Sequence, residues 1–384
     1  MKKVNHMRRV LLILVPLILP QIFVAQGNRV HVSIDPTVDT SNKAIESVVK
    51  LWEQYLNSHP DSVFDNPFWS ELEKRQYKPF DLVGYTYWTP NFYHLIFSRW
   101  KATVLSVSLS DSSFIIRTMF YFSNAKDSCE VYVRSIIQTA ARLENGSYRL
   151  CNVLPVNTRL WHHEQVGSIK FIFPLDHVFD RALAERMNGF IDSLTTLWGL
   201  KPALTQYYFA DEMDRVAKAL GFDYWPSEGN VTGPRGFTDV PNRIIYSGGS
   251  SEWYPHEFVH VYINPLFPKA HYYFLEGYAT LMGGSKGHGL LWHIKRNYQY
   301  LKDHPEVDAL SFKGVDLYIG PQYFIGGLLC RLAEEKGGLQ LVRKLMKYGP
   351  EDEDLYRAIH DIFGVSKEGV NSFLRAKLAE YSAE

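Results

Sequence analysis

The chain has 384 residues, with 41 Lys and Arg against 41 Asp and Glu, and 46% of its residues are apolar. This length is enough for one large or two ordinary domains, each with a buried core. The balanced charge argues against a protein that binds the phosphate backbone, so no nucleic-acid partner is expected. A charged fraction of 21% with 15% aromatic residues excludes a disordered or fibrous chain.

The N-terminus has the pattern of a secretory signal peptide. Basic residues precede an apolar run over 10–25, which is shorter than the roughly 20 residues that a spanning helix needs. Small residues before Gly27 predict cleavage near that position. We therefore predict a signal peptide over 1–27 and export to the periplasm or the extracellular space, with no stable membrane anchor after cleavage. An uncleaved membrane anchor is the alternative.

The three cysteines do not have the spacing of a thiolate zinc site. Cys129 and Cys151 flank a predicted hairpin region, and an exported protein can keep disulfides. A Cys129–Cys151 bridge and two buried thiols are both compatible with this pattern, while Cys330 lies in an apolar helical run.

An α+β domain is predicted over 28–166. Apolar residues over 45–56 repeat with the period of a helix, and a short helix is predicted over 69–76. An Asn145-Gly146 turn separates the last two of the strand-like runs that follow, at 102–110, 114–122, 130–141 and 148–154. Helices followed by an antiparallel meander are similar to the nuclear-transport-factor-like cone, in which helices cover a curved sheet.

Strands and helices alternate after residue 167, which indicates a small mixed sheet. Only helix and loop are predicted after Ser251. We therefore expect an α+β protein whose second domain, over 167–384, is zincin-like with a mainly helical C-terminal part. The strands of this domain are predicted at 168–173, 204–209 and 243–246, and its first helices at 179–198 and 211–220.

Residues 256–260 have the sequence His-Glu-Phe-Val-His. On a helix, His256 and His260 lie on one face about 6 Å apart, so both imidazoles can bind one metal ion. Glu257 is rotated by about 100° from His256, and so lies beside the metal where a base is needed. The alternative is a structural helix whose histidines form local hydrogen bonds.

The ends of this helix are also predicted. Ser250 or Ser251 is expected to cap it, and Pro255 suits its first turn, where an N–H group is not needed. The residues expected on its buried face are Phe258, Val259, Tyr262 and Ile263.

Glu276 is a lone carboxylate in the apolar run Phe-Leu-Glu-Gly-Tyr-Ala-Thr over 274–280. A buried carboxylate needs a partner, and two histidines with one glutamate and an open fourth position form a hydrolytic zinc site. One Zn²⁺ per chain is therefore predicted. A salt-bridged structural glutamate is the alternative.

Together, HEFVH and LEGYAT resemble the gluzincin superfamily, the aminopeptidase-N-like and peptidase-MA-like zinc peptidases. Their pattern is HExxH followed by Glu-Gly-aromatic-Ala on the next helix. The run Tyr-Phe-Ile-Gly-Gly over 323–327 resembles the Tyr-x-x-Gly that opens a later helix of the family. The resemblance covers about 167–384. It implies that the zinc ligands are His256, His260 and Glu276, that Glu257 is the general base, and that Tyr323 stabilises the oxyanion.

Two features depart from the family pattern. The spacing between His260 and Glu276 is shorter than in aminopeptidase N, and the Gly-x-Met-Glu-Asn motif that binds a substrate's free amine is missing. A broader peptidase is therefore predicted rather than an aminopeptidase. The stretch over 228–246 occupies the place of the family's edge strand, along which an extended peptide can pair.

A phenol opposite the metal can donate to the oxyanion while staying protonated. Tyr323 is the predicted donor and Tyr318 competes with it, and both rings can instead be packing aromatics. Gly326 and Gly327 are expected to leave room for a substrate backbone.

Several polar residues near these motifs have an expected role that is mainly structural. Thr280, one turn after Glu276, is expected either to orient a ligand imidazole or to pack within its helix. Five histidines are expected to be solvated or core polar groups: His162, His163, His271, His288 and His293. The last three can also approach the cleft.

The predicted function is that of a secreted zinc peptidase that hydrolyses peptides or proteins with metal-activated water. One alternative is a catalytically degenerate scaffold that binds a peptide or another ligand, and another is an enzyme acting on non-peptide esters or amides. The presence of Glu257 favours an enzyme, because a binding protein does not need this base. The sequence does not indicate the oligomeric state.

Overall fold

The computed structural model describes residue 30 and residues 32–58, 66–87, 101–123, 131–225, 235–310 and 320–383. The predicted signal peptide over 1–27 lies outside these residues, as do Cys129 and Tyr318. Helices and two mixed sheets form the α+β fold that the sequence predicts. Within the described ranges, no helix is both long and apolar enough to cross a membrane.

The first sheet has six strands: β1 (Val32–Ile34), β2 (Lys101–Ser110), β3 (Ser113–Ser123), β4 (Val131–Glu144), β5 (Ser147–Cys151) and β9 (Phe222–Tyr224). Strands β2 to β5 form the predicted antiparallel meander, while β1 pairs in parallel with β2 and β9 pairs with β4. The β4–β5 turn has φ values of 52° at Asn145 and 79° at Gly146, which an Asn-Gly pair adopts readily.

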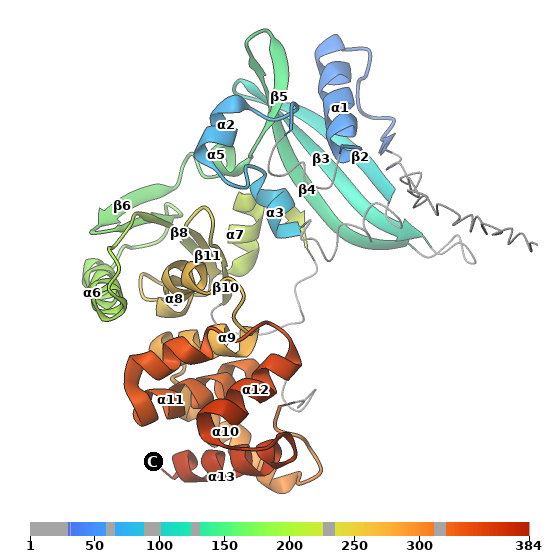
Figure 1. Ribbon diagram of the computed structural model, residues 1–384. Helices are drawn as coiled ribbons and strands as arrows, with labels where there is room; N and C mark the ends of the chain where they lie inside the picture. The colour runs from blue at the N-terminus through green and yellow to red at the C-terminus, as the bar shows by residue number, and fades with distance from the viewer. Residues whose placement is uncertain are drawn as a thin grey trace, which may run out of the picture.

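Short helices and α1 (Lys43–Leu56) pack around this sheet (Figure 1). Trp52 of α1 donates its indole N–H to Thr118 Oγ1 of β3 at 2.9 Å, which fixes the helix on the sheet. The second predicted helix begins at Glu71 instead of Trp69, because Trp69 forms a bridge with Leu150 of β5. The short helices are α2 (Glu71–Gln76), α3 (Leu82–Tyr87) and α5 (Leu154–Asn157).

The second sheet has the strand order β10-β11-β8-β7-β6. Its three central strands are parallel and both edge strands are antiparallel to their neighbours, which gives the predicted mixed sheet. Its strands are β6 (His162–Val166), β7 (Ile169–Phe173), β8 (Thr205–Ala210), β10 (Arg235–Asp239) and β11 (Ile244–Gly248), and α6 (Arg181–Trp198) and α7 (Met213–Leu220) follow β7 and β8.

Side chains of the second sheet alternate between two cores. Tyr207 and Phe209 of β8 pack with the C-terminal helices, whereas Tyr208 and Ala210 pack toward the first sheet. The second core, here called the junction core, contains residues from both predicted domains, and β6 and β7 pair across the predicted boundary at 166. Its members include Trp52, Trp69, Phe80, Ile116, Phe120, Ile172, Tyr208, Val216, Ile244 and Tyr246.

The segment after Ser251 is helix and loop, as predicted, and forms the orange and red part of Figure 1. Its helices are α8 (Pro255–Ile263), α9 (Tyr272–Gly283), α10 (Leu290–Asp303), α11 (Pro321–Leu345), α12 (Asp352–Phe363) and α13 (Val370–Ser382). Non-helical backbone at Gly337 and Gly338 kinks α11.

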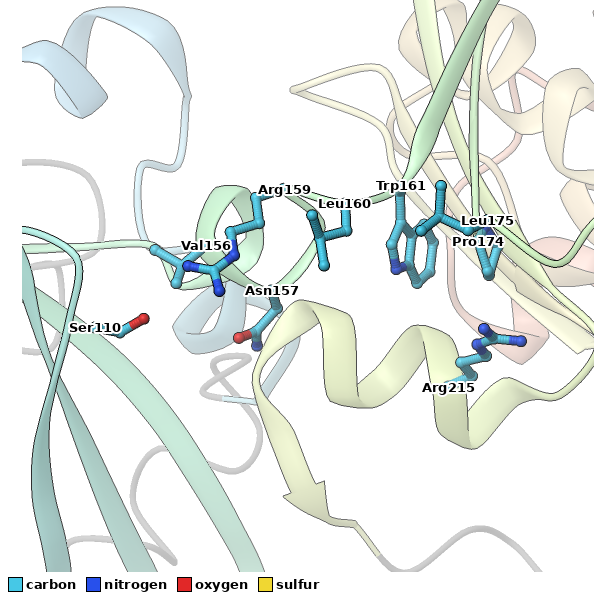
Figure 2. Close-up of a pocket in the computed structure, with 9 residues that line it drawn as sticks. All are labelled: Ser110, Val156, Asn157, Arg159, Leu160, Trp161, Pro174, Leu175 and Arg215. Carbon is cyan, nitrogen blue, oxygen red and sulfur yellow. The ribbon is translucent and has the colours of Figure 1, made fainter.

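A cavity of about 400 Å³ lies where α5 and α7 meet the ends of β2 and β7 (Figure 2). Leu160, Trp161 and Leu175 supply apolar walls. Its guanidinium groups are already paired, since Arg159 contacts Asp111 and Arg215 contacts Asp176. None of the predicted metal ligands lines this cavity.

Cys151 and Cys330 are buried, and within the described residues neither forms a disulfide. Burial raises the pKa of Cys151 to about 12, so this thiol stays protonated and unreactive. Since Cys129 lies outside the described residues, the bridge between Cys129 and Cys151 stays a prediction.

Asp81, directly before α3, is a buried acid. Its carboxylate accepts hydrogen bonds from the Tyr55 hydroxyl and from the backbone N–H of Gly84. Burial raises the pKa of Asp81 to about 6. The folded protein therefore binds this proton more tightly than the unfolded chain does, and the free energy of unfolding falls as the pH rises from about 4 to about 6.

Asp81→Asn removes this ionisation while keeping an acceptor oxygen. We expect the free energy of unfolding of the variant, relative to wild type, to rise by about 2 kcal/mol between pH 4 and pH 7. Urea unfolding at several pH values measures this difference. Asp111→Asn, at an exposed acid, is the control, and parallel pH profiles for Asp81→Asn and wild type would contradict the prediction.

Candidate metal centre

Every residue of α8 is buried, so the expectation of a single buried face was too narrow. The helix begins at Pro255 after Tyr254, and no side chain caps it. Proline suits this first position because it has no N–H group to satisfy there. The predicted caps, Ser250 and Ser251, were therefore wrong. Instead, the Tyr207 hydroxyl bonds with Ser250 Oγ at 2.9 Å and donates to the Ser251 carbonyl at 2.8 Å.

The three predicted metal ligands lie together, two on α8 and one on α9. His256 Nε2 is 3.3 Å from Glu276 Oε2 and 3.3 Å from His260 Nε2, and His260 Nε2 is 3.6 Å from Glu276 Oε2. Ligand atoms that bind one tetrahedral zinc ion at 2.0–2.1 Å are about 3.3 Å apart. The spacing of the three donor atoms therefore fits a single zinc ion.

The far nitrogen of each imidazole contacts an oxygen acceptor. His256 Nδ1 is 2.7 Å from the carbonyl oxygen of Gly284, and His260 Nδ1 is 3.2 Å from Asn264 Oδ1. An Nδ1–H group that donates to these oxygens leaves Nε2 as the nitrogen that can bind a metal ion. The two acceptors therefore favour the tautomer that a metal ion requires.

The position of Gly284 depends on its lack of a side chain. Its φ of 74° is in the region that favours glycine, and its backbone oxygen meets His256 only because α9 ends there. Asn264 lies one turn after His260, a spacing that the sequence displays. The contact to Gly284 has no comparable sequence signal, because it is made by a main-chain carbonyl.

The cluster is open to solvent on the carboxylate side. The side chains of His256 and His260 are 7% and 8% exposed, whereas that of Glu276 is 29% exposed. Burial by itself raises the pKa of Glu276, but the two histidines outweigh it and hold that pKa well below its usual range. Burial lowers the pKa of His260, whereas the charge of Glu276 raises it. The effect of Glu276 is the stronger in sum with its hydrogen bond, and the pKa of His260 rises to about 9.

Glu257 is buried beside the cluster, and β10 holds its carboxylate. Thr238 Oγ1 donates to Glu257 Oε2 at 2.7 Å. Gly236, also on β10, faces both Tyr254 and Glu257: a Cβ atom there would lie 2.7 Å from Tyr254 Cε1 and 3.1 Å from Glu257 Cγ. The missing side chain at Gly236 therefore lets α8 lie close to the edge strand. Sequence reasoning missed Thr238 and Gly236, because only the fold brings β10 to α8.

Gly326 and Gly327 allow α9 and α11 to touch, so the expectation that they leave room for a substrate was wrong. A Cβ atom at Gly326 would lie 1.9 Å from the Tyr273 carbonyl oxygen, and one at Gly277 would lie 2.1 Å from the Gly326 carbonyl carbon. These glycines therefore fix the position of α9, which carries Glu276.

Two phenols lie near the cluster. Tyr323 at the start of α11 is half-buried, with its ring centroid 5.9 Å from that of His256. Tyr254, which sequence reasoning missed, precedes α8, and burial followed by the charge of Glu257 raises the pKa of its phenol. Both rings can serve as neutral donors, and the competing candidate Tyr318 lies outside the described residues.

The remaining predicted polar residues have structural contacts. Thr280 is buried and donates to the Glu276 carbonyl oxygen at 2.8 Å, so it packs within its own helix and does not orient an imidazole. His162 and His163 are exposed on β6. Of the other histidines, His271 caps α9, His288 stacks on Trp292, and His293 contacts the Ser285 carbonyl oxygen.

A scan against models of known protein families gives no match, and a search of curated proteins gives none. The interpretation of this site therefore depends on its residues and geometry.

Removing a ligand tests the metal centre directly. We expect the protein to take up about one zinc ion per chain and Glu276→Ala to take up almost none, because two histidines alone hold zinc weakly. Metal analysis after dialysis measures the zinc content, and a chelator should lower the melting temperature of wild type but not that of the variant. His288→Ala is the control. An unchanged zinc content in Glu276→Ala would exclude this ligand set.

Proposed function

We propose that the chain is a zinc-dependent peptidase. The observation that carries the proposal is the position of Glu257, a buried carboxylate held by Thr238 directly beside the cluster of two histidines and a glutamate. A cluster that only stabilised the fold would need the three ligands but not a further acid at this position. The Glu257 carboxylate therefore favours a hydrolytic site over a structural one.

Each residue has a defined part in the proposed reaction. His256, His260 and Glu276 would hold a zinc ion, which would supply Lewis-acid polarisation of the scissile carbonyl and a more acidic water. The Glu257 carboxylate takes a proton from the attacking water and then delivers it to the leaving nitrogen. The Tyr323 phenol donates to the oxygen on which negative charge develops.

The edge strand supports a peptide as the substrate. Within the described residues, β10 is an edge strand of the second sheet, and its Thr238 contacts the proposed general base. An extended peptide that pairs with this edge would bring its carbonyl groups past Glu257. An ester or amide without a backbone would not use this strand. Export of the enzyme stays a proposal from the N-terminal sequence.

Glu257→Gln separates metal binding from catalysis. Glutamine keeps the size of the side chain and an acceptor for Thr238, but it cannot take up a proton. We expect about one zinc ion per chain and a loss of hydrolysis of roughly 10²–10⁴-fold, measured by mass spectrometry on a mixed peptide library. Glu185→Gln, at an exposed position on α6, should behave as wild type. Full activity in zinc-loaded Glu257→Gln would contradict the assignment of the base.

Tyr323→Phe tests the oxyanion donor. We expect this variant to keep its zinc and its KM but to lose about 10²–10³-fold in kcat, because the lost hydrogen bond strengthens only in the transition state. Steady-state kinetics measures both constants, and Tyr298→Phe on α10 is the matched control. Normal turnover would move the assignment to another phenol, which Tyr318→Phe and Tyr254→Phe would identify.

A further inference from the structure

The side-chain amide of Asn242 joins the turn between β10 and β11 to the first predicted domain. Asn242 in this turn donates from Nδ2 to the Pro79 carbonyl oxygen at 3.0 Å, and its Oδ1 accepts the backbone N–H of Lys78. The same Nδ2 group also donates to Asp239 Oδ2 at 2.7 Å. Asn242 therefore bridges the loop over 77–79 and the last residue of the edge strand.

Asp239 depends on this bridge. Asp239 is only 3% exposed. Within the described residues, its carboxylate accepts hydrogen bonds from two groups, both of Asn242: the side-chain amide and, at 3.2 Å, the backbone N–H. Burial raises the pKa of Asp239 to about 6. Removing the Asn242 side chain would leave a buried acid with one weak donor, which is unfavourable for the folded edge strand.

The residues directly after the loop over 77–79 are fixed to the first sheet. Asn152, directly after β5, donates from Nδ2 to the Phe80 carbonyl oxygen at 2.7 Å, and its Oδ1 accepts the backbone N–H of Leu82 at 2.9 Å. Its backbone N–H donates to the buried Glu73 carboxylate at 3.0 Å. The loop is thus a rigid support, and its contact to Asn242 is held from the core of the first sheet.

We propose that the first predicted domain positions the general base through Asn242, which anchors the end of β10 and so keeps Thr238 over Glu257. Thr238 precedes Asp239 on β10, and its hydroxyl is the group that bonds Glu257 Oε2. Asn242 touches neither substrate nor metal and is a positioning residue. The inference gives the N-terminal unit a part in catalysis, and it depends on the proposed peptidase function.

The two units also meet at a second amide, which supplies a matched control. Asn157 of α5 donates from Nδ2 to the Lys218 and Ala219 carbonyl oxygens of α7, at 2.9 and 3.3 Å. This bridge joins the same two units, but it lies on α7 and not on the edge strand. Any effect of Asn242→Ala that comes only from looser docking should therefore be present in Asn157→Ala.

Amide hydrogen exchange tests the anchor without any substrate. We expect Asn242→Ala to speed exchange over 235–239 about tenfold, with α8 unchanged, because one buried hydrogen-bond bridge is lost. Asn157→Ala should leave exchange over 235–239 as in wild type. Unchanged exchange in Asn242→Ala, or equal effects of both variants on β10, would overturn the anchoring role.

Kinetics on the zinc-loaded protein then tests the link to Glu257. Asn242→Ala should keep about one zinc per chain and its KM while kcat falls about 10–100-fold, since a displaced base reacts poorly. Thr238→Val should lower kcat similarly, and the double variant should be no worse than Thr238→Val alone. Additive losses would overturn the route through Thr238. If wild type cleaves no peptide, the proposed function fails, whereas hydrogen exchange still decides the anchor.

Discussion

The close contact of three helix backbones determines the geometry of the metal centre. Two imidazoles and a carboxylate from different helices converge within 3.6 Å only when α8 and α9 nearly touch. Gly283 permits this, since a Cβ atom there would lie 2.6 Å from the His256 backbone nitrogen, and Gly277 and Gly326 do the same between α9 and α11. Helices in cores normally lie 8–10 Å apart, with the distance set by the side chains between them, so glycine is the residue that allows a closer approach. The ligand distances follow from these small residues.

The base and the metal ligands are held by different parts of the fold. The ligands belong to two helices of the C-terminal core, whereas the hydrogen-bond partner of Glu257 belongs to the edge of the second sheet. The central strand β8 of that sheet is buried on both faces, with Tyr207 on one side and Tyr208 on the other. A strand covered on both faces has little freedom to tilt, because any movement displaces two cores that are packed like crystals. The sheet therefore gives the helices a fixed reference surface.

Local patterns predicted much of this structure, and the parts that they missed are tertiary. Helical periodicity indicated α1, an Asn-Gly pair indicated the β4–β5 turn, and i, i+4 spacing placed His256 and His260 on one face. The position of Thr238 on β10 carries no such signal, because its contact with Glu257 depends on how a helix lies against a sheet. The wrong interpretation of Gly326 has the same origin: a glycine that admits a substrate and a glycine that admits another helix are identical in sequence.

The two histidine ligands differ in how their orientation is secured. The acceptor for His256 is the carbonyl oxygen of Gly284, a main-chain atom that no side-chain replacement elsewhere can delete, whereas the acceptor for His260 is the side chain of Asn264. A substitution at position 264 can thus release the imidazole of His260 to rotate while that of His256 remains fixed. The robustness of the centre to sequence change is therefore asymmetric: the His260 contact depends on the side chain of Asn264, whereas the His256 contact depends on the backbone conformation of Gly284.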